Sequence, residues 1–276
     1  MKLYKVQSGV VIEDNEGKKY FKTINNWDIY LNREDLYAFL QSEIQDLDTV
    51  NDDFLTAVQA PIQSQEVWAA GVTYLRSRDA RMEESKEEAG ATFYDLVYVA
   101  ERPELFFKAT AQRTVGTNQK VRIRKDSNWD VPEPELTLVI TSSGKIVGYT
   151  VGNDMSSRSI EGENPLYLPQ AKVYEKCAAL GPCIYVPENP IAPDTKISIS
   201  IVRNNVVMYS DNVAISQMKR KHQELVDFLF RECEFPYGCF LMTGTCMVPP
   251  NDFTLQSNDE ISITIDHIGT LKNTVE

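Results

Sequence analysis

Short apolar runs separated by Gly, Pro and Asn turns dominate the second half of the chain. Each run is rich in β-branched residues and short enough for a single strand, which is typical of a sheet protein. A different spacing occurs near residue 220, where Met218, Leu225, Val226 and Leu229 mark one face of a helix. The pattern predicts a mostly β fold of the α+β class, with a late helix over 217–232 covering one side of a rolled sheet. The runs are 121–124, 180–186, 196–202, 206–208 and 260–265.

The first 60 residues differ from the rest of the chain in their pattern of hydrophobic and polar positions. Runs 2–12 and 18–24 predict two strands around the polar turn 13–17. Asn32 is a good N-cap for a helix over 33–47, whose inner face carries Leu36, Phe39, Leu40 and Ile44. The polar segment 48–53 and Pro61 then form a link. We therefore expect a small N-terminal α+β domain, 1–60, and a larger domain, 61–276.

The larger domain opens with a buried strand over 67–72. A charged helical stretch follows over 74–88, and a short aromatic helix over 93–99.

Two apolar runs, 136–140 and 146–151, flank the turn 141–145 and predict a β-hairpin. Because side chains two apart on a strand share a face, Glu133 and Glu135 point the same way. If the turn centres between Ser143 and Gly144, facing residues have numbers that sum to 287. Asp154 then lies opposite Glu133, and three carboxylates converge.

Three converging carboxylates repel one another unless a cation lies between them. An all-oxygen donor set suits Mg²⁺, Mn²⁺ or Ca²⁺ rather than zinc. The alternative is that paired acids on a strand form a solvated face. Two details favour the metal site: the acids lead directly into an apolar run, and Pro132 and Pro134 place them at the start or edge of a strand.

Composition narrows the function classes. The chain has 276 residues, 42% of them hydrophobic and 25% charged, as in an ordinary soluble globular protein. A formal net charge of −12 argues against nucleic-acid binding. The lack of a long apolar stretch or signal-like N-terminus predicts a cytoplasmic protein without membrane attachment. Five cysteines without a CxxC pair are expected to be reduced.

The only two histidines, His222 and His267, are far apart in the sequence. A Ser-His-Asp triad or a His-rich metal site is therefore not expected, and acid–base work falls to carboxylates or lysines.

The order of several motifs resembles the fumarylacetoacetate hydrolase family from about residue 67 to the C-terminus. Within that family, segment 163–170 followed by Lys172 is most similar to the 2-keto-3-deoxy-D-arabinonate dehydratase branch. The resemblance implies the family's β-roll fold and a homodimer or homotetramer. The motifs are Gly-Val-Thr-Tyr (71–74), Glu-Arg-Pro-Glu-Leu-Phe-Phe-Lys-Ala (101–109), Pro-Glu-Pro-Glu-Leu (132–136), Asn-Asp-Met-Ser-Ser-Arg (153–158), Gln-Ala-Lys (170–172) and Thr-Gly-Thr (243–245).

The resemblance also assigns roles. It implies that Glu133, Glu135 and Asp154 hold a divalent metal, usually Mg²⁺, and that Lys172 and Glu104 are catalytic. The substrate-binding residues that we expect are Gly244, Thr245, Lys108 and Phe106. For Lys108 the alternative is a solvated strand end, and for Phe106 it is a place in the core. Arg158 is expected to pair with an acid such as Glu161 or to orient a metal ligand.

One departure from the family pattern bears on the reaction. Hydrolases of the family carry a His and a Glu that activate water, where this chain has Ser77 and Ala80. The missing pair argues against C–C bond hydrolysis and leaves elimination, which needs no activated water. The resemblance thus predicts a Mg-dependent dehydratase of a 2-keto-3-deoxy sugar acid in pentose catabolism, yielding 2,5-dioxopentanoate and water.

In this reaction a metal-bound 2-keto acid would lose a C3 proton to Lys172, or have its enolate stabilised by Lys172, while Glu104 protonates the leaving C4 hydroxyl. The two roles could be reversed. The nearest alternative is a C–C hydrolase or decarboxylase of acylpyruvates or oxaloacetate on the same metal site. A non-catalytic binding module is a further alternative, which would keep the acids but not need Lys172 or Glu104.

Overall fold

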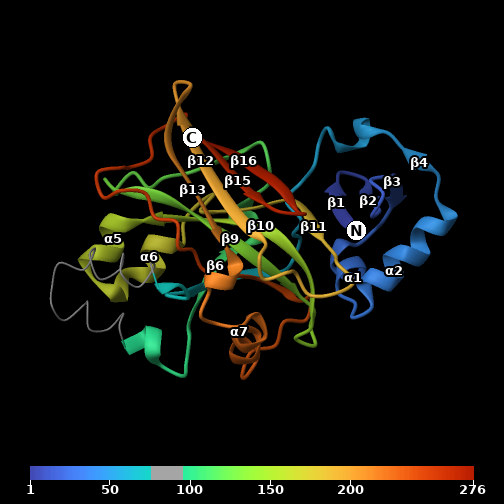
Figure 1. The fold of residues 1–276 in the computed structure, drawn as a ribbon, viewed down its shortest axis with the longest axis horizontal. Helices are drawn as coiled ribbons and strands as arrows, with labels where there is room; N and C mark the ends of the chain where they lie inside the picture. Colours follow the sequence, from blue (N-terminus) through green and yellow to red (C-terminus); the bar gives the residue numbers. More distant parts are fainter. Residues whose placement is uncertain (76–95) are drawn as a thin grey trace.

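The computed structural model describes residues 1–75 and 96–276. Three sequence predictions fall wholly or largely outside these residues: the charged helical stretch over 74–88 from residue 76 on, the first part of the helix over 93–99, and Ser77 and Ala80. Within them the chain forms two β-sheets with short helices at the periphery (Figure 1). This architecture confirms the predicted mostly β fold.

The larger sheet has eleven strands in the order β4-β3-β2-β1-β11-β10-β9-β14-β5-β6, with β7 paired to β11 off this path. Most neighbours are antiparallel, but β14 runs parallel to β5. The strands are β1 (Lys2–Val6), β2 (Gly9–Glu13), β3 (Lys19–Thr23), β4 (Thr49–Val50), β5 (Glu66–Gly71), β6 (Glu104–Thr110), β7 (Thr114–Val115), β9 (Asp130–Ile140), β10 (Ile146–Ser157), β11 (Ala178–Tyr185) and β14 (Cys239–Met242).

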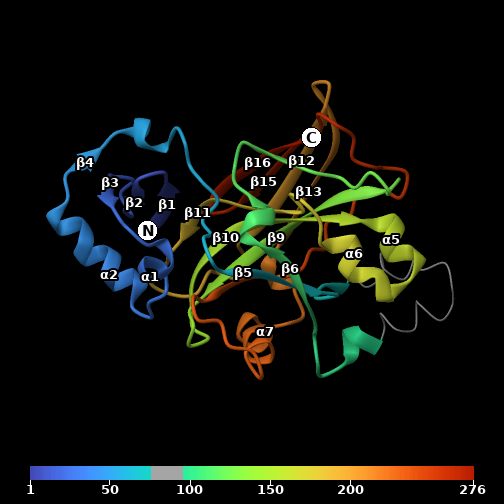
Figure 2. The ribbon, with the colours of Figure 1, turned by 180° about the vertical axis from the view of Figure 1, so that it is seen from behind.

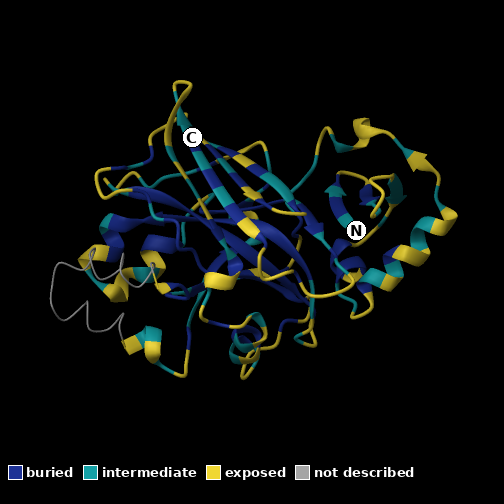
Figure 3. Cartoon of the chain, in the orientation of Figure 1, coloured by how far each residue is buried: buried dark blue, intermediate teal, exposed yellow. Residues whose placement is uncertain are grey.

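A second sheet of five strands, in the order β13-β12-β15-β16-β8, packs against the first. Its strands are β8 (Gln119–Val121), β12 (Lys196–Arg203), β13 (Val206–Ala214), β15 (Glu260–Ile265) and β16 (Gly269–Val275). Leu136 and Leu138 of β9 meet Ile197, Ile199 and Ile263 of this sheet in the main core. The central strands are accordingly the most completely buried part of the molecule (Figure 3).

The helices α1 (Trp27–Leu31) and α2 (Leu36–Glu43) belong to the N-terminal unit, and α7 (His222–Leu229) lies at the lower side in the view of Figure 1. Two further short helices, α5 (Arg158–Glu163) and α6 (Leu168–Lys172), follow β10 and lie side by side at the opposite end from the N-terminal unit (Figure 2). In the part of the chain that the structure describes, no helix has the length and apolar content needed to cross a membrane.

The N-terminal strands extend the large sheet, because β1 pairs with β11 through Lys2↔Tyr185 and Leu3↔Ile184. A second core joins Leu3, Trp27 and Leu40 to Val139 and Phe240 of the central strands. The expected domain boundary at residue 60 stays a prediction, but the sheet and this core are continuous across it.

Two local predictions in the N-terminal unit were wrong. The run 2–12 forms two strands rather than one, since the chain turns back at residues 7–8. Asn32 ends α1 instead of starting a helix, and Asn26 caps α1 through a side-chain bond to the Ile29 N–H. The Asn32 amide donates to Ser142 Oγ and the Pro236 carbonyl, so tertiary contacts hold it.

Two predictions in the larger domain also differ from the structure. The run 121–124 is not a strand, because β8 ends at Val121. The helix predicted over 217–232 is only α7, His222–Leu229, preceded by a 3₁₀ turn at Ile215–Gln217. Leu225, Val226 and Leu229 are its buried face, as the spacing predicted.

The predicted hairpin register is confirmed. In the β9–β10 pair Asp154 faces Glu133, Gly152 faces Glu135, and Gly148 faces Val139, each with numbers that sum to 287. A bulge between Ile146 and Gly148 shifts only the end next to the turn. The register holds where the acids lie, so the hairpin positions the candidate site.

Candidate active site

The three carboxylates converge on one face of the β9–β10 hairpin. Carboxylate oxygens of Glu133, Glu135 and Asp154 lie within 4.8 Å of one another, and none of the three residues is more than 5% exposed. The alternative of a solvated acidic face is therefore wrong, because β9 is buried along its whole length.

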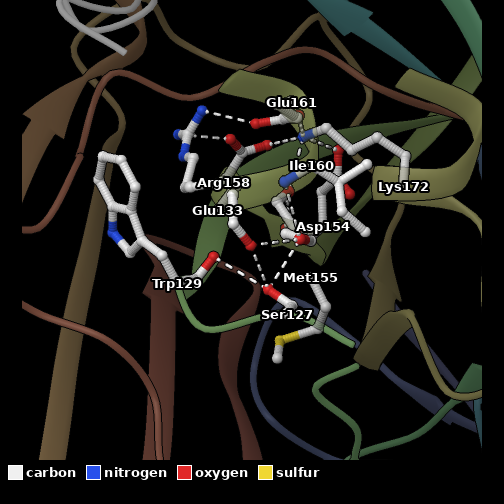
Figure 4. A network of polar contacts seen from close by, with 12 residues as sticks. Ser127, Trp129, Glu133, Asp154, Met155, Arg158, Ile160, Glu161 and Lys172 are labelled. Atoms are coloured by element: carbon white, nitrogen blue, oxygen red, sulfur yellow. Dashed lines mark hydrogen bonds and ion pairs between the residues drawn. The ribbon is translucent and has the colours of Figure 1, made fainter. Parts of the chain in front are cut away.

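Lys172, the last residue of α6, extends its ammonium group into this acidic cluster (Figure 4). Its Nζ donates to Glu133 Oε2, to Asp154 Oδ2 at 3.1 Å and to Ser156 Oγ at 2.7 Å. Pro169 in the first turn of α6 favours the start of this short helix, because its fixed φ suits that position and a missing N–H costs nothing there. The helix thus places a lysine beside the predicted metal ligands.

Lys108, in the interior of β6, contacts the other carboxylate oxygen of Asp154. Its Nζ lies 2.5 Å from Asp154 Oδ1 and donates to the carbonyls of Met155 and Lys172. Lys108 is completely buried, so the alternative of a solvated strand end is wrong. It does not line the pocket described below, and it contacts Asp154, a predicted metal ligand, and the end of α6.

Arg158 and Glu161 add a buried ion pair to the cluster (Figure 4). Ser157 caps α5 through the Ile160 N–H, which points the first residue of the helix toward the acids. Arg158 Nη2 lies 2.7 Å from Glu133 Oε1, and its Nη1 lies 3.0 Å from Glu161 Oε2. Glu161 Oε1 also lies 3.4 Å from Lys172 Nζ. Arg158 therefore pairs with Glu161, as expected, and it also contacts Glu133, one of the predicted metal ligands.

A small pocket opens above the carboxylates. Besides the three acids, Lys172 and Arg158, its walls include Phe106 of β6 and the loop residues Gly244 and Thr245. The Gly244 N–H donates to Glu135 Oε2 at 2.6 Å, with the glycine at a φ of +95°. The remaining lining residues are Ala70, Gly71, Val72 and Val248.

Glu104 faces Gly71 across the β5–β6 pair. A Cβ added to Gly71 would lie 1.9 Å from Glu104 Oε2, so this carboxylate lies directly over the glycine backbone. Because Gly71 lines the pocket, Glu104 lies at the pocket's edge rather than among the acids.

The electrostatics of the acids fit a divalent cation. Burial, together with the negative charges of Asp154 and Glu133, raises the pKa of Glu135 well above its usual range. A bound divalent cation removes that penalty, and buried carboxylate oxygens are the ligands that Mg²⁺ prefers. Glu133, Glu135 and Asp154 would hold the ion.

The structure brings together seven of the nine residues assigned from the sequence, since Lys172, Glu133, Glu135, Asp154, Phe106, Gly244 and Thr245 all line one pocket. Glu104 and Lys108 adjoin it. Sequence reasoning missed Ser156, which accepts from Lys172, and the contact between Glu161 and Lys172. The period-2 pattern gave a signal for Ser156, which shares a strand face with Asp154.

Comparison with known proteins finds relatives that are named as sugar-acid dehydratases. A probable 2-keto-3-deoxyxylonate dehydratase of Haloferax volcanii is 49% identical over 233 residues, covering 84% of this chain and 79% of the relative. A 2-dehydro-3-deoxy-D-arabinonate dehydratase of Saccharolobus solfataricus is 44% identical over 218 residues, covering 78% of this chain and 72% of the relative.

Solved structures of a dehydratase and of a fumarylacetoacetate hydrolase also resemble this chain. A 2-keto-3-deoxy-D-arabinonate dehydratase complexed with magnesium and 2,5-dioxopentanoate superposes with a TM-score of 0.83 at 35% identity, over 100% of this chain and 99% of the other. A fumarylacetoacetate hydrolase from Exiguobacterium antarcticum, at 20% identity and a TM-score of 0.72, shares the fold.

The model of the fumarylacetoacetate (FAA) hydrolase C-terminal family matches residues 78–276, which is most of the chain. With the hairpin of acids, the lysine beside them and these relatives, the chain belongs to the fumarylacetoacetate hydrolase family.

Proposed function

We propose that this protein is a Mg²⁺- or Mn²⁺-dependent dehydratase of a small 2-keto-3-deoxy sugar acid. The observation that carries the proposal is the buried cluster of Glu133, Glu135, Asp154 and Lys172 at the base of a small pocket. Relatives with 49% and 44% identity bear dehydratase names, and a solved dehydratase holds magnesium and 2,5-dioxopentanoate. The preferred substrate is 2-keto-3-deoxy-D-arabinonate, which would yield 2,5-dioxopentanoate and water.

The metal, when bound, supplies Lewis-acid stabilisation of the enolate of a 2-keto acid. Lys172 lines the pocket and is assigned the C3 proton, either as the base or as the group that stabilises the enolate. Glu104, at the pocket's edge, is assigned protonation of the leaving C4 hydroxyl. Loss of the C3 proton and the C4 hydroxyl releases one water, and tautomerisation of the product gives the aldehyde.

Gly244 and Thr245 are assigned to the substrate carboxylate, and Phe106 to the wall of the pocket. Phe106 also lies 5.6 Å from Lys172 Nζ, measured to the ring centroid, so the ring shields the ammonium group from solvent. For Lys108, burial and contact with Asp154 favour a supporting role over the substrate contact expected from the sequence.

A substrate panel tests the reaction. Purified protein with Mg²⁺ should convert a 2-keto-3-deoxypentonate to a semialdehyde, and EDTA should abolish the conversion. Acylpyruvates and oxaloacetate should release no pyruvate. Pyruvate release without dehydration would establish the hydrolase or decarboxylase alternative, and metal binding without turnover of any of these acids would favour a binding module.

Isotope exchange separates the roles of Lys172 and Glu104. In D₂O, Glu104→Gln should still exchange the C3 protons of the substrate while losing dehydration, whereas Lys172→Met should lose both. The reverse result would exchange the two roles. Lys176→Met is the matched control, because Lys176 is partly exposed and pairs only with Glu276 among the ion pairs of the described residues.

We further propose a cytoplasmic homodimer or homotetramer that acts in pentose catabolism. All five cysteines are free, which fits a reducing compartment. Strand β13 ends the five-stranded sheet and exposes Val206, Val207 and Met208, an apolar edge that a partner subunit could cover.

A further inference from the structure

The charges buried at the active site are nearly balanced among the described residues. Seven ionisable side chains that are at most 5% exposed meet there, three positive and four negative, so with all seven ionised the cluster carries one net negative charge. A bound divalent cation changes the net charge of the cluster to one positive, and one monoanionic ligand then brings the net charge to zero. The seven are Lys108, Lys172, Arg158, Glu133, Glu135, Asp154 and Glu161.

Glu161 is the acid in this balance that is not a predicted metal ligand. Its two oxygens face the two cations of the pocket wall, with Oε2 3.0 Å from Arg158 and Oε1 3.4 Å from Lys172. Each of these cations also contacts Glu133. Arg158 and Lys172 are therefore already paired with carboxylates of the protein when no ligand is bound.

The remaining wall of the pocket offers no compensating charge within residues 1–75 and 96–276. Ala70, Val72, Phe106 and Val248 are apolar. Glu104 lies at the edge over Gly71, and it is assigned the neutral, protonated form in the reaction proposed above. Against the described part of the wall, a second carboxylate on the ligand would therefore lie next to apolar groups and an acid.

We propose that Glu161 is a specificity-determining residue that restricts the site to monoanionic 2-keto acids by neutralising Arg158 and Lys172. The inference rests on the proposed function and deepens it. A dicarboxylate leaves this buried site with a net negative charge that a monocarboxylate does not, and burying an uncompensated charge is costly. Glu161→Gln keeps the size of the side chain and an oxygen acceptor. It leaves one unit of positive charge on Arg158 and Lys172 without a protein carboxylate, and a dianionic ligand can pair with that charge.

A pair of ligands matched in chain length tests the proposal. 2-Oxopentanoate and 2-oxopentanedioate are both five-carbon 2-keto acids, neither carries a C4 leaving group, and they differ in one carboxylate. Their affinities are measured by calorimetry at saturating Mg²⁺, after the Mg²⁺ affinity of each variant has been measured. The unsubstituted protein should bind the monoanion at least about tenfold more tightly.

In Glu161→Gln the affinity for the dianion should rise at least about tenfold, while that for the monoanion changes much less. A gain of binding is a result that structural damage does not produce. Glu163→Gln is the matched control, because Glu163 lies on the same helix but is exposed, and it should leave the ratio unchanged. Thermal unfolding checks that both variants are folded.

Equal binding of the two ligands by the unsubstituted protein would overturn the charge selectivity and leave the dehydratase proposal standing. If the ratio of monoanion affinity to dianion affinity were unchanged in Glu161→Gln, Glu161 would not determine the specificity. Failure of both ligands to bind with Mg²⁺ present would overturn this inference together with the 2-keto acid site itself.

Discussion

At the residue scale, the acids of the site were predictable from the sequence because they depend on local rules. Strand periodicity places Glu133 and Glu135 on one face, and hairpin pairing brings Asp154 opposite Glu133. The contact of Lys108 with Asp154 was not predictable, because it requires β6, α6 and the hairpin to meet in the folded chain. The pairing of Glu161 with Lys172 depends in the same way on how two short helices pack.

Replacing Glu135 by Gln should lower Mg²⁺ affinity at least about tenfold, since one anionic ligand is lost with little change in size. The fold should survive, because an amide oxygen can still accept from the Gly244 N–H. Without metal, the variant should be no less stable than the parent, as a repelled buried charge has been removed. Calorimetric titration with Mg²⁺ and thermal unfolding measure the two effects. Unchanged Mg²⁺ affinity would remove Glu135 from the ligand set.

His222 should make the protein less stable in mild acid. Burial lowers the pKa of this imidazole to about 4, while the unfolded chain has the ordinary value near 6.5. Above the unfolded-state pKa, where the imidazole is neutral in both states, His222 costs the protein no stability. As the pH drops toward the folded-state pKa, the unfolding free energy falls, because the unfolded state binds the proton more readily. Between pH 8 and pH 5 the linkage amounts to about 2 kcal/mol of unfolding free energy.

Urea unfolding at pH 8 and pH 5 measures this effect. His222→Phe should lose less stability than the parent over that interval, by about the same 2 kcal/mol. The exposed His267 supplies the control, and His267→Asn, which suits its positive φ, should behave like the parent. A similar acid loss in all three proteins would show that other groups are responsible.

At the element scale, strands in the centre of the sheet were easier to predict than the elements at its ends. Runs such as 67–72 and 260–265 correspond closely to β5 and β15, because burial on both sides or strict alternation dictates their composition. The division of 2–12 into β1 and β2 was missed, since the turn at Gln7-Ser8 lacks the usual Asn-Gly signal. Asn32 was misassigned because a good cap residue fits either end of a helix.

The close approach of β5 and β6 gives a prediction of its own. Gly71→Ala would place a methyl group against the Glu104 carboxylate, so that side chain must move away from the pocket's edge. Turnover should fall at least about tenfold while Mg²⁺ affinity stays within about twofold, because a misplaced acid affects only the chemical step. Ala70→Gly, the reverse exchange one residue earlier, controls for altered strand propensity. Full activity in Gly71→Ala would remove Glu104 from the reaction.

At the scale of the whole molecule, the resemblance to the family carried more of the prediction than the pattern did. Alternation indicates strands but not their order, and the parallel β5–β14 pair joins segments about 170 residues apart. The β-roll was therefore expected from the family motifs, and the structural neighbours confirm it.

We expect the protein to assemble as a closed homodimer or homotetramer, with each active site complete within one chain. The exposed apolar edge of β13 is the feature that a partner should cover, since open apolar edges promote uncontrolled association. Light scattering at micromolar concentration should give two or four times the 31.3 kDa chain mass. Val207→Lys should shift the distribution toward monomers, with Asn212→Lys, at an exposed position of the same strand, as the control for added charge. A fully active monomer would contradict the expectation.

The pairing of β1 with β11 has a consequence for how the protein is made. At about 5–20 residues per second, a ribosome needs on the order of ten seconds or more to deliver β11 after β1 has been synthesised. The loop that supplies the Gly244 N–H to the site emerges later still. The nascent chain therefore carries an open-edged hairpin of β1 and β2 until β11 is made, and it acquires its catalytic centre only after the Gly244 loop has emerged.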